Sequence, residues 1–167
     1  MLNVIKAIAL DVDGVLTDGT FCWGPDGQES KRFSFRDVMG ISQASKAGVI
    51  FALISGENSP LVDRFGEKVG IDPQNIFKGC RNKDEALRKF ATNRGLELGE
   101  IAFMGDDIND LAAMRLAGCC AAPADAHLQV RQIARFVCHS GGGQGAVREF
   151  IDHLVSLNHI QCQQTHV

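Results

Sequence analysis

The chain alternates short runs of apolar residues with longer segments of mixed polarity. Three runs are apolar at every position and stop abruptly at polar residues: residues 7–10 before Asp11-Val12-Asp13, 49–54 before Ser55-Gly56, and 101–104 before Gly105-Asp106-Asp107. Runs this short and this apolar are typical of strands buried on both faces, as in a parallel sheet. Shorter strands are expected near residues 75–77, 119–121 and 135–137.

Residues that start and stop helices fill the segments between these strands. Asp37 is expected to cap a helix that runs to about Lys46, while Ser59 and Pro60 begin a second helix that Gly70 ends. Further helices are expected after Asn82, from Asp107 to about Ala117, and over residues 146–157. This alternation predicts an α/β fold, a doubly wound, Rossmann-like parallel sheet with right-handed crossovers.

One segment, at about residues 20–35, breaks the alternation. Two stretches that contain aromatic residues flank Gly24-Pro25-Asp26-Gly27, a sequence typical of a turn, so a projecting β-hairpin is predicted here. The hairpin would expose the rings of Phe21, Trp23, Phe33 and Phe35. Exposed apolar patches mark interfaces, so we expect a homo-oligomer, with a tetramer as its size. No repeat or linker divides the chain, and residues 1–167 are expected to form a single domain.

The fold prediction brings distant polar residues together. In parallel sheets, ligands bind beyond the carboxyl ends of the strands, where Asp11, Asp13, Ser55, Asp106 and Asp107 all lie. Carboxylates this close together repel one another unless a cation sits between them. Oxygen ligands without nearby Cys or His favour magnesium over zinc. The sequence therefore predicts a magnesium site at this edge.

The same set of residues suits the hydrolysis of a phosphomonoester. Asp11 can act as a nucleophile, and Asp13 can protonate the leaving alcohol and later activate water. The Ser55 hydroxyl, the Gly56 N–H and the Lys83 ammonium can hold the phosphate oxygens. Each feature alone also has a structural explanation, such as a turn or a helix cap. Their joint occurrence, in this order and at predicted strand ends, favours catalysis.

Composition narrows the remaining possibilities. A formal net charge of -3 gives no electrostatic case for nucleic-acid binding. The six cysteines form no Cys-x-x-Cys pair, which argues against a zinc knuckle, and they suggest no disulfide framework. No apolar stretch approaches the ~18 residues of a membrane span, and the N-terminal run lacks the features of a signal peptide. We therefore expect a cytoplasmic protein that binds no membrane.

The motifs resemble those of the haloacid dehalogenase superfamily. Residues 11–19 (DVDGVLTDG) are similar to its first motif, and Ser55, Lys83 and residues 105–110 (GDDIND) match its second, third and fourth motifs. The resemblance implies that Asp11 is phosphorylated and that Asp13 is the general acid and base. It also implies that magnesium binds the Asp11 carboxylate, the Asp13 backbone carbonyl and Asp106. Asp107 would be an orienting residue or a further ligand.

The resemblance extends to one branch of this superfamily, over roughly residues 4–157. A hairpin in place of a cap domain, Arg36-Asp37 and residues 142–149 resemble the branch that acts on 3-deoxy-2-keto sugar acid phosphates. That branch contains phosphatases of 3-deoxy-D-manno-octulosonate 8-phosphate and of nonulosonate 9-phosphates, and it serves lipopolysaccharide or sialic acid biosynthesis. The resemblance implies a homotetramer in which hairpins pack together and a neighbouring subunit helps to close each active site. Arg36 is expected to bind substrate or phosphate.

One departure from the branch pattern concerns the sugar. Octulosonate phosphatases usually carry Arg after the Ser/Thr-Gly of the second motif and again eight positions later, where this chain has Glu57 and Phe65. Glu57 with Lys68 resembles the pair of the nonulosonate phosphatases, which faces the sugar across a subunit boundary. We therefore expect a modest preference for the nine-carbon substrate. Alternatively, Glu57 only fills the turn before Ser59.

Other interpretations compete with this one. The chain could be a non-catalytic assembly domain of the kind fused to sugar cytidylyltransferases, a phosphatase of another small sugar phosphate, or a phosphotransferase. The glycine-rich loop 141–145 lacks the ending of a P-loop, and contact with substrate stays open for it. His159, Cys162 and His166 could bind a metal, but a polar tail is favoured. His127, His139 and His153 have no evident acidic or nucleophilic partner and are interpreted as surface or packing residues.

Overall fold

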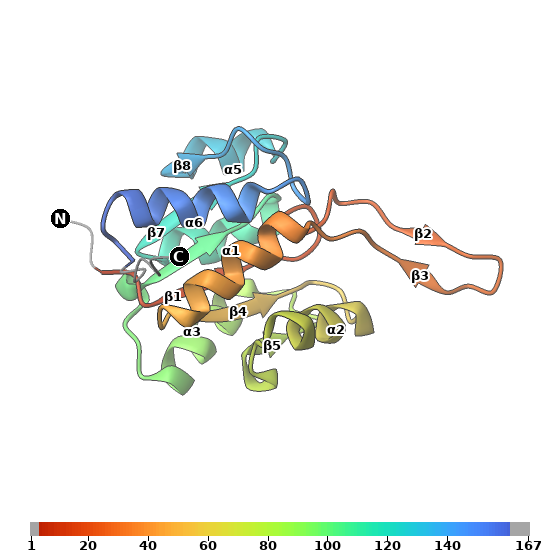
Figure 1. The fold of residues 1–167 in the computed structure, drawn as a ribbon, viewed down its shortest axis with the longest axis horizontal. Helices are drawn as coiled ribbons and strands as arrows, with labels where there is room; N and C mark the ends of the chain where they lie inside the picture. The colour runs from red at the N-terminus through yellow and green to blue at the C-terminus, as the bar shows by residue number, and fades with distance from the viewer. Residues whose placement is uncertain (1–3, 161–167) are drawn as a thin grey trace, which may run out of the picture.

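A six-stranded parallel sheet forms the centre of the molecule (Figure 1). The computed structural model describes residues 4–160. The sheet has the order β5-β4-β1-β6-β7-β8, and every neighbouring pair of strands is parallel. The strands are β1 (Ala7–Leu10), β4 (Ile50–Ile54), β5 (Ile76–Phe77), β6 (Ile101–Met104), β7 (Cys119–Ala122) and β8 (Phe136–Val137). The chain moves from β1 to one edge and then returns to β6 on the other side, so the switch point lies at β1. The predicted doubly wound parallel sheet is confirmed.

Two layers of helices cover the sheet. On one face lie α1 (Phe35–Lys46), α2 (Pro60–Val69) and α6 (Ala146–Ser156), and on the other lie α3 (Lys83–Arg94), α4 (Leu111–Leu116) and α5 (Leu128–Ile133). Alternate residues of β1 serve the two layers, since Ile8 and Leu10 join the first core and Ala7 and Ala9 the second. Three single turns of 3-10 helix, η1 (Pro73–Asn75), η2 (Leu98–Glu100) and η3 (Ile108–Asp110), complete the connections.

Helix boundaries differ from the sequence prediction at α1 and α5. Ser34, not Asp37, caps α1: its backbone is extended and its side chain accepts a hydrogen bond from the Arg36 N–H. Asp37 is buried in the first turn of α1, and its carboxylate accepts a hydrogen bond from the N–H of Arg148, in the first turn of α6. The helix α5 was not predicted, because six residues are too few to show a helical period.

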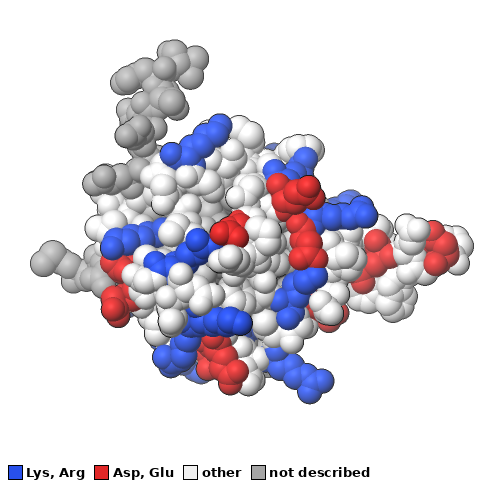
Figure 2. Space-filling model, turned by 90° about the horizontal axis from the view of Figure 1, so that it is seen from below, with Lys and Arg blue, Asp and Glu red and all other residues white. Residues whose placement is uncertain are grey.

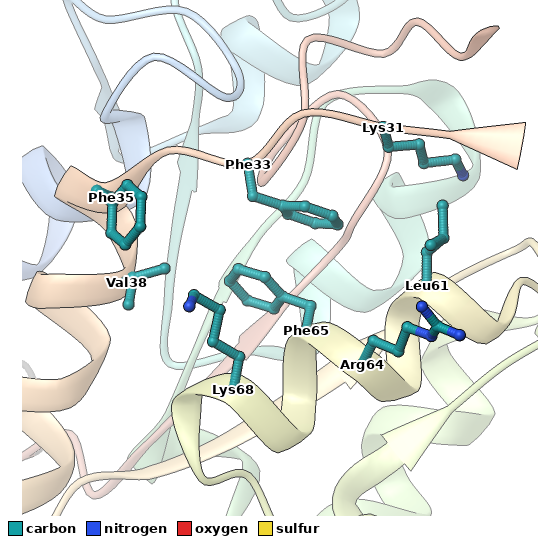
Figure 3. A pocket seen from close by; sticks show the side chains of 8 residues that line it. All are labelled: Lys31, Phe33, Phe35, Val38, Leu61, Arg64, Phe65 and Lys68. Atoms are coloured by element: carbon teal, nitrogen blue, oxygen red, sulfur yellow. The ribbon is translucent and has the colours of Figure 1, made fainter.

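The hairpin is an arm, residues 20–34, that projects from the body at the right of Figure 1. Its strands β2 (Cys22–Trp23) and β3 (Glu29–Ser30) are antiparallel, and no cap domain occurs within residues 4–160. Phe21, Trp23 and Phe35 are 52%, 69% and 72% exposed, as predicted. The prediction was wrong for Phe33, which is partly buried and stacks on Phe65 with ring centroids 4.5 Å apart (Figure 3).

Charge is mixed over the visible surface. Figure 2 shows basic and acidic side chains interspersed across one face of the body, with further acidic groups on the arm. Within the described residues, we find no helix long and apolar enough to cross a bilayer.

Candidate active site

The carboxyl ends of β1, β4 and β6 meet at one cavity of about 270 Å³. Residues from these strand ends and from α3 line it: Asp11, Asp13, Gly19, Gly56, Glu57, Lys83, Asp106, Asp107 and Asn109. Asp11 follows β1 directly, is buried, and donates its backbone N–H to the carbonyl of Met104. This bond to the end of β6 fixes Asp11 beside the Gly105-Asp106 turn. Asp11, Asp13, Lys83 and Asp106 therefore converge as predicted.

Lys83 and Asp110 support Asp11, the predicted nucleophile. Lys83, the first residue of α3, is buried with its Nζ 2.6 Å from Asp11 Oδ1 and 2.6 Å from Asp110 Oδ1. The second oxygen of Asp110 accepts the backbone N–H groups of Asp106 (2.9 Å) and Asp107 (3.1 Å). Burial opposes the charge of Lys83, but the two carboxylates outweigh it and raise the pKa of the ammonium. Asp110 thus joins α3 to the loop after β6.

Asp110 had no assigned role in the sequence-based set, although it closes the fourth motif. In the sequence, a carboxylate at position 110, near the start of a predicted helix, is typical of a helix cap. The structure instead shows both of its oxygens engaged and no room for a side chain at Gly105, whose added Cβ would lie 2.5 Å from the Asp110 Cβ. Gly105 and Asp110 are therefore one packing unit.

The carboxylates are crowded enough to need a cation. Oxygens of Asp11, Asp106 and Asp110 lie within 4.8 Å of one another. Burial, helped by repulsion from Asp110, raises the pKa of Asp11 well above its ordinary value, although Lys83 opposes the rise. Burial likewise raises the pKa of Asp106 to about 6, against the hydrogen bond that it shares with Asp11. A bound cation would favour the ionised forms of both.

The donor set fits a hard divalent cation. Asp106 Oδ1 is buried with no hydrogen-bond partner within the described residues, whereas both oxygens of Asp110 are taken. Asp11 and Asp106 are thus the side chains that would hold the ion, and Asp110 would orient them. Gly14, at φ +94°, provides the space, because a Cβ there would overlap the Asp106 carboxylate. The Asp13 backbone carbonyl stays a predicted third ligand.

Asp13 lies at the rim of the cavity and has a partner that the sequence did not reveal. Lys31 Nζ, from the root of the arm, is 2.7 Å from Asp13 Oδ1. Nothing in the sequence marks this lysine, since it lies 18 positions from Asp13 in a hairpin that was expected to serve assembly. The contact joins the arm to the carboxylate that is expected to transfer protons.

The turn after β4 contains Ser55 and Gly56, which are predicted to bind phosphate. Ser55 is buried, and its hydroxyl accepts the backbone N–H of Glu57 at 3.1 Å, so this hydroxyl stabilises the turn that presents Gly56. Asp107 lines the cavity and caps η3 by accepting the N–H of Ile108 at 2.7 Å. Asn109, which the sequence-based set omitted, also faces the cavity.

Comparisons with known proteins agree with this geometry. A haloacid dehalogenase-like hydrolase family model matches residues 74–151. The 3-deoxy-D-manno-octulosonate 8-phosphate phosphatases of Salmonella typhi and Escherichia coli K12 are each 36% identical over 151 residues, 90% of this chain and 79% of theirs. The chain belongs to this family of haloacid dehalogenase-like hydrolases. The family phosphatase from Moraxella catarrhalis, solved with magnesium ion, phosphate ion and KDO, superposes with a TM-score of 0.89 at 35% identity, covering 93% of this chain and 88% of that one.

A larger protein shares the domain. The N-acylneuraminate cytidylyltransferase of Oncorhynchus mykiss is 32% identical over 159 residues, which is 93% of this chain but 36% of that protein. Domains of the same hydrolase family therefore also occur as part of a longer chain.

Three residues expected to bind substrate or phosphate do not line the catalytic cavity of this hydrolase: Ser55, which is fully buried, Arg36 and Lys68. Lys68 lines a separate cavity of about 290 Å³ between α1, α2 and the arm, with its ammonium 5.2 Å from the centre of the Phe35 ring (Figure 3). Glu57 lines the catalytic cavity, so one chain does not bring Glu57 and Lys68 into the same cavity. Arg36 lies at the start of α1 beside Gly145, and it is not among the residues that line the catalytic cavity.

The glycine-rich loop packs against the loop that follows Asp11. The Gly143 N–H donates to the carbonyl of Val15 at 3.0 Å, and a Cβ at Gly142 would overlap the carbonyl of Gly14. These glycines allow two backbones to touch, and neither lines the catalytic cavity.

The histidine predictions need one correction. His139, expected to have no partner, contacts Glu149, with its Nδ1 2.9 Å from Glu149 Oε1. His153 stacks on Phe136, in keeping with a packing role. Of the suggested metal-binding tail, Cys162 and His166 lie outside the described residues.

Proposed function

We propose that this chain is a magnesium-dependent phosphatase that removes the terminal phosphate of a 3-deoxy-2-keto sugar acid, with 3-deoxy-D-manno-octulosonate 8-phosphate as a substrate. The observation that carries the proposal is the meeting of buried Asp11 and Lys83 with half-buried Asp106 in the lining of one cavity. The names of the relatives support the substrate class. We also propose that the enzyme acts in the cytoplasm as a homotetramer.

Each residue has a defined part in the two steps. The Asp11 carboxylate attacks phosphorus, the bond from phosphorus to the sugar oxygen breaks, and Asp13 gives its proton to that oxygen. Water then attacks the aspartyl phosphate, Asp13 takes the proton of the water, and inorganic phosphate leaves. Lys83 offsets negative charge beside Asp11 in both steps. Magnesium held by Asp11 and Asp106 would neutralise phosphate charge and orient the attack.

The first experiment distinguishes catalysis from an assembly role. The match to a cytidylyltransferase keeps that alternative open. A non-catalytic domain has no need for a largely buried cluster of repelling carboxylates, so Asp11 and Asp106 favour catalysis. We expect turnover of an aryl phosphate that requires magnesium and stops with a chelator. Absence of turnover with magnesium would contradict the proposal.

A second candidate substrate is favoured by Glu57. Its side chain lines the catalytic cavity, where the octulosonate phosphatases usually carry Arg. A carboxylate accepts hydrogen bonds from hydroxyl or amine groups and repels anions, whereas Arg binds them. We therefore propose that Glu57 selects a nine-carbon sugar acid 9-phosphate modestly over the eight-carbon substrate.

The deciding measurement is kcat/KM for both sugar acid phosphates in wild type and in Glu57→Arg. We expect the variant to shift preference toward the eight-carbon substrate. Glu67→Arg, which reverses the same charge at an exposed position of α2, is the matched control and should leave the preference unchanged. A wild-type preference of tenfold or more for the octulosonate, about 1.4 kcal/mol, would show that Glu57 does not select the sugar.

A further inference from the structure

Lys31 lies in the arm, and its side chain is buried. It follows β3 at the root of the arm, and its side chain is 4% exposed, whereas that of its neighbour Arg32 is 90% exposed. Placing an ammonium out of water costs free energy unless it is paired. Its partner is Asp13 Oδ1 at 2.7 Å, so the buried charge lies directly against the expected acid and base.

Lys31 is itself held from the other side. Glu29 Oε1 lies 3.4 Å from Lys31 Nζ, and the same oxygen accepts the hydroxyl of Ser59 at 3.1 Å. Ser59 is the N-cap of α2, three residues beyond the turn at Gly56. A continuous polar chain therefore runs from Asp13 through Lys31 and Glu29 to the helix that follows the phosphate-binding turn.

The position of Lys31 argues against direct contact with substrate. Asp13 lines the catalytic cavity, while Lys31 lies behind it and lines the neighbouring cavity of about 290 Å³. Figure 3 shows the Lys31 side chain extending along the arm, on the same side of that cavity as Leu61. Of the residues that line the catalytic cavity, Asp13 is the one that Lys31 pairs with, so an effect of Lys31 on the reaction is expected to act through Asp13.

Asp13 needs such a partner. Its side chain is 29% exposed at the rim, and an unpaired carboxylate there would sample several rotamers. Proton transfer requires the acid within hydrogen-bond reach of the leaving oxygen, and a misplacement of about 1 Å can cost roughly 10²-fold in rate. A bond from Lys31 to Oδ1 fixes the carboxyl group and leaves Oδ2 for the proton.

We propose that Lys31 is the positioning residue for Asp13 and holds it in the orientation that protonates the leaving alcohol. The inference rests on the proposed phosphatase function and adds the arm to the catalytic apparatus. It follows that Lys31 matters most where the leaving group most needs a proton.

The test compares Lys31→Met, Lys31→Arg and the matched control Arg32→Met, which removes a positive charge one position away. Each is assayed on a series of aryl phosphates of increasing leaving-group basicity and on the sugar acid phosphates. For Lys31→Met we expect kcat to fall about threefold or less on 4-nitrophenyl phosphate and about 10²-fold on the sugar acid phosphate. Lys31→Arg should recover about tenfold of that loss, and Arg32→Met should match wild type throughout.

The outcomes separate the two proposals. An equal loss across the whole series, or a loss confined to KM, would overturn the positioning role, because either points to folding or to substrate binding. Thermal unfolding of each variant shows whether it is folded. If Lys31→Met is unfolded, Lys31→Arg decides the question by how steeply its kcat falls as the leaving group of the aryl phosphate becomes more basic. A wild type that hydrolyses aryl phosphates but no sugar acid phosphate contradicts the substrate proposal only, since the aryl series still tests Lys31. A wild type without any turnover contradicts both.

Discussion

The catalytic edge, meaning Asp11, Asp13, Lys83, Asp106 and Asp110, and the arm are built in opposite ways. Within the catalytic edge, Lys83 bridges Asp11 and Asp110, while Asp110 accepts two backbone N–H groups. The arm has two strands of two residues each. The rings of Phe21 and Trp23 pack together, with their centroids 4.9 Å apart, but both remain exposed. One region is completed by its own chain, and the other leaves apolar surface uncovered.

The difference separates chemistry from assembly. Electrostatic contacts in a buried setting hold the catalytic edge, so removing one partner leaves a charge without compensation. If the proposed assembly uses the exposed rings of the arm, substitutions of those rings should weaken the oligomer and leave the folded chain stable. Lys31 is the point at which the two regions meet.

The largest expected effect is at Asp11. Asp11→Asn keeps the shape of the side chain but cannot form the acyl phosphate, so turnover should fall by roughly 10³-fold or more. Thermal unfolding and magnesium-dependent binding of phosphate should be largely retained. Near-normal activity in this variant would end the covalent mechanism.

The next effect is on stability at the catalytic edge. Asp110→Ala leaves Lys83 with Asp11 as its single carboxylate partner, and it leaves the N–H groups of Asp106 and Asp107 without their acceptor. We expect the free energy of unfolding, measured in urea, to fall by about 3 kcal/mol. Asp107→Ala removes an exposed cap and should cost about 1 kcal/mol. Equal costs for the two variants would show that the Lys83 pair does not stabilise this edge.

The arm should show the reverse pattern. Replacing both Phe21 and Trp23 with Ser removes exposed rings, so the dissociation constant of the oligomer should rise about tenfold. The free energy of unfolding of the chain should change by about 0.5 kcal/mol or less. Light scattering and thermal unfolding measure the two quantities. Phe33→Ala is the contrast, because its ring packs on Phe65 and its loss should cost about 2 kcal/mol of stability. A wild type that scatters as a monomer at micromolar concentration would contradict assembly.

The smallest effect depends on pH and concerns the support behind the catalytic edge. Glu149 accepts the N–H groups of His139 and Ser140, which lead into the glycine-rich loop. Burial raises its pKa, but these bonds outweigh burial and lower the pKa to about 2 from an ordinary 4.5. The folded state therefore favours the carboxylate, and its stabilisation is complete above pH 4.5 and lost as the pH falls toward 2.

Glu149→Gln tests this dependence. At pH 7 the variant should be about 1 kcal/mol less stable than wild type, and the difference should disappear between pH 4.5 and pH 2. Urea unfolding at several pH values measures it. A difference that is constant over that range would assign the effect to packing.

The sequence predicted the sheet and most of the catalytic edge because both depend on local pattern and a topological rule. Apolar runs that end in Asp11 and Asp106 specify strands, and parallel pairing places their ends together. The fourth-motif residue Asp110 was recognised in the sequence but not in its role, since its bond to Lys83 spans 27 positions.

Side-chain contacts between distant elements could not be predicted from the sequence. Lys31 reaches Asp13, Asp37 reaches the start of α6, and Phe33 stacks on Phe65, and each depends on where the arm and α1 meet the body. No spacing or period encodes such contacts. The separation of Glu57 from Lys68 into different cavities is of the same kind.

The central place of β1 in the sheet has a consequence for how the chain folds. Both neighbours of β1 come from later sequence, since Ala7 aligns with Ile50 and with Ile101. Pairings across about 40 and about 90 residues form slowly, because closing a long loop loses conformational entropy before the stabilising contacts form. During synthesis both neighbours of β1 are therefore present only after β6, the fourth of the six sheet strands in chain order, has left the ribosome. The mutual repulsion of Asp11 and Asp106 arises only at that late stage, when most of the apolar core is available to oppose it.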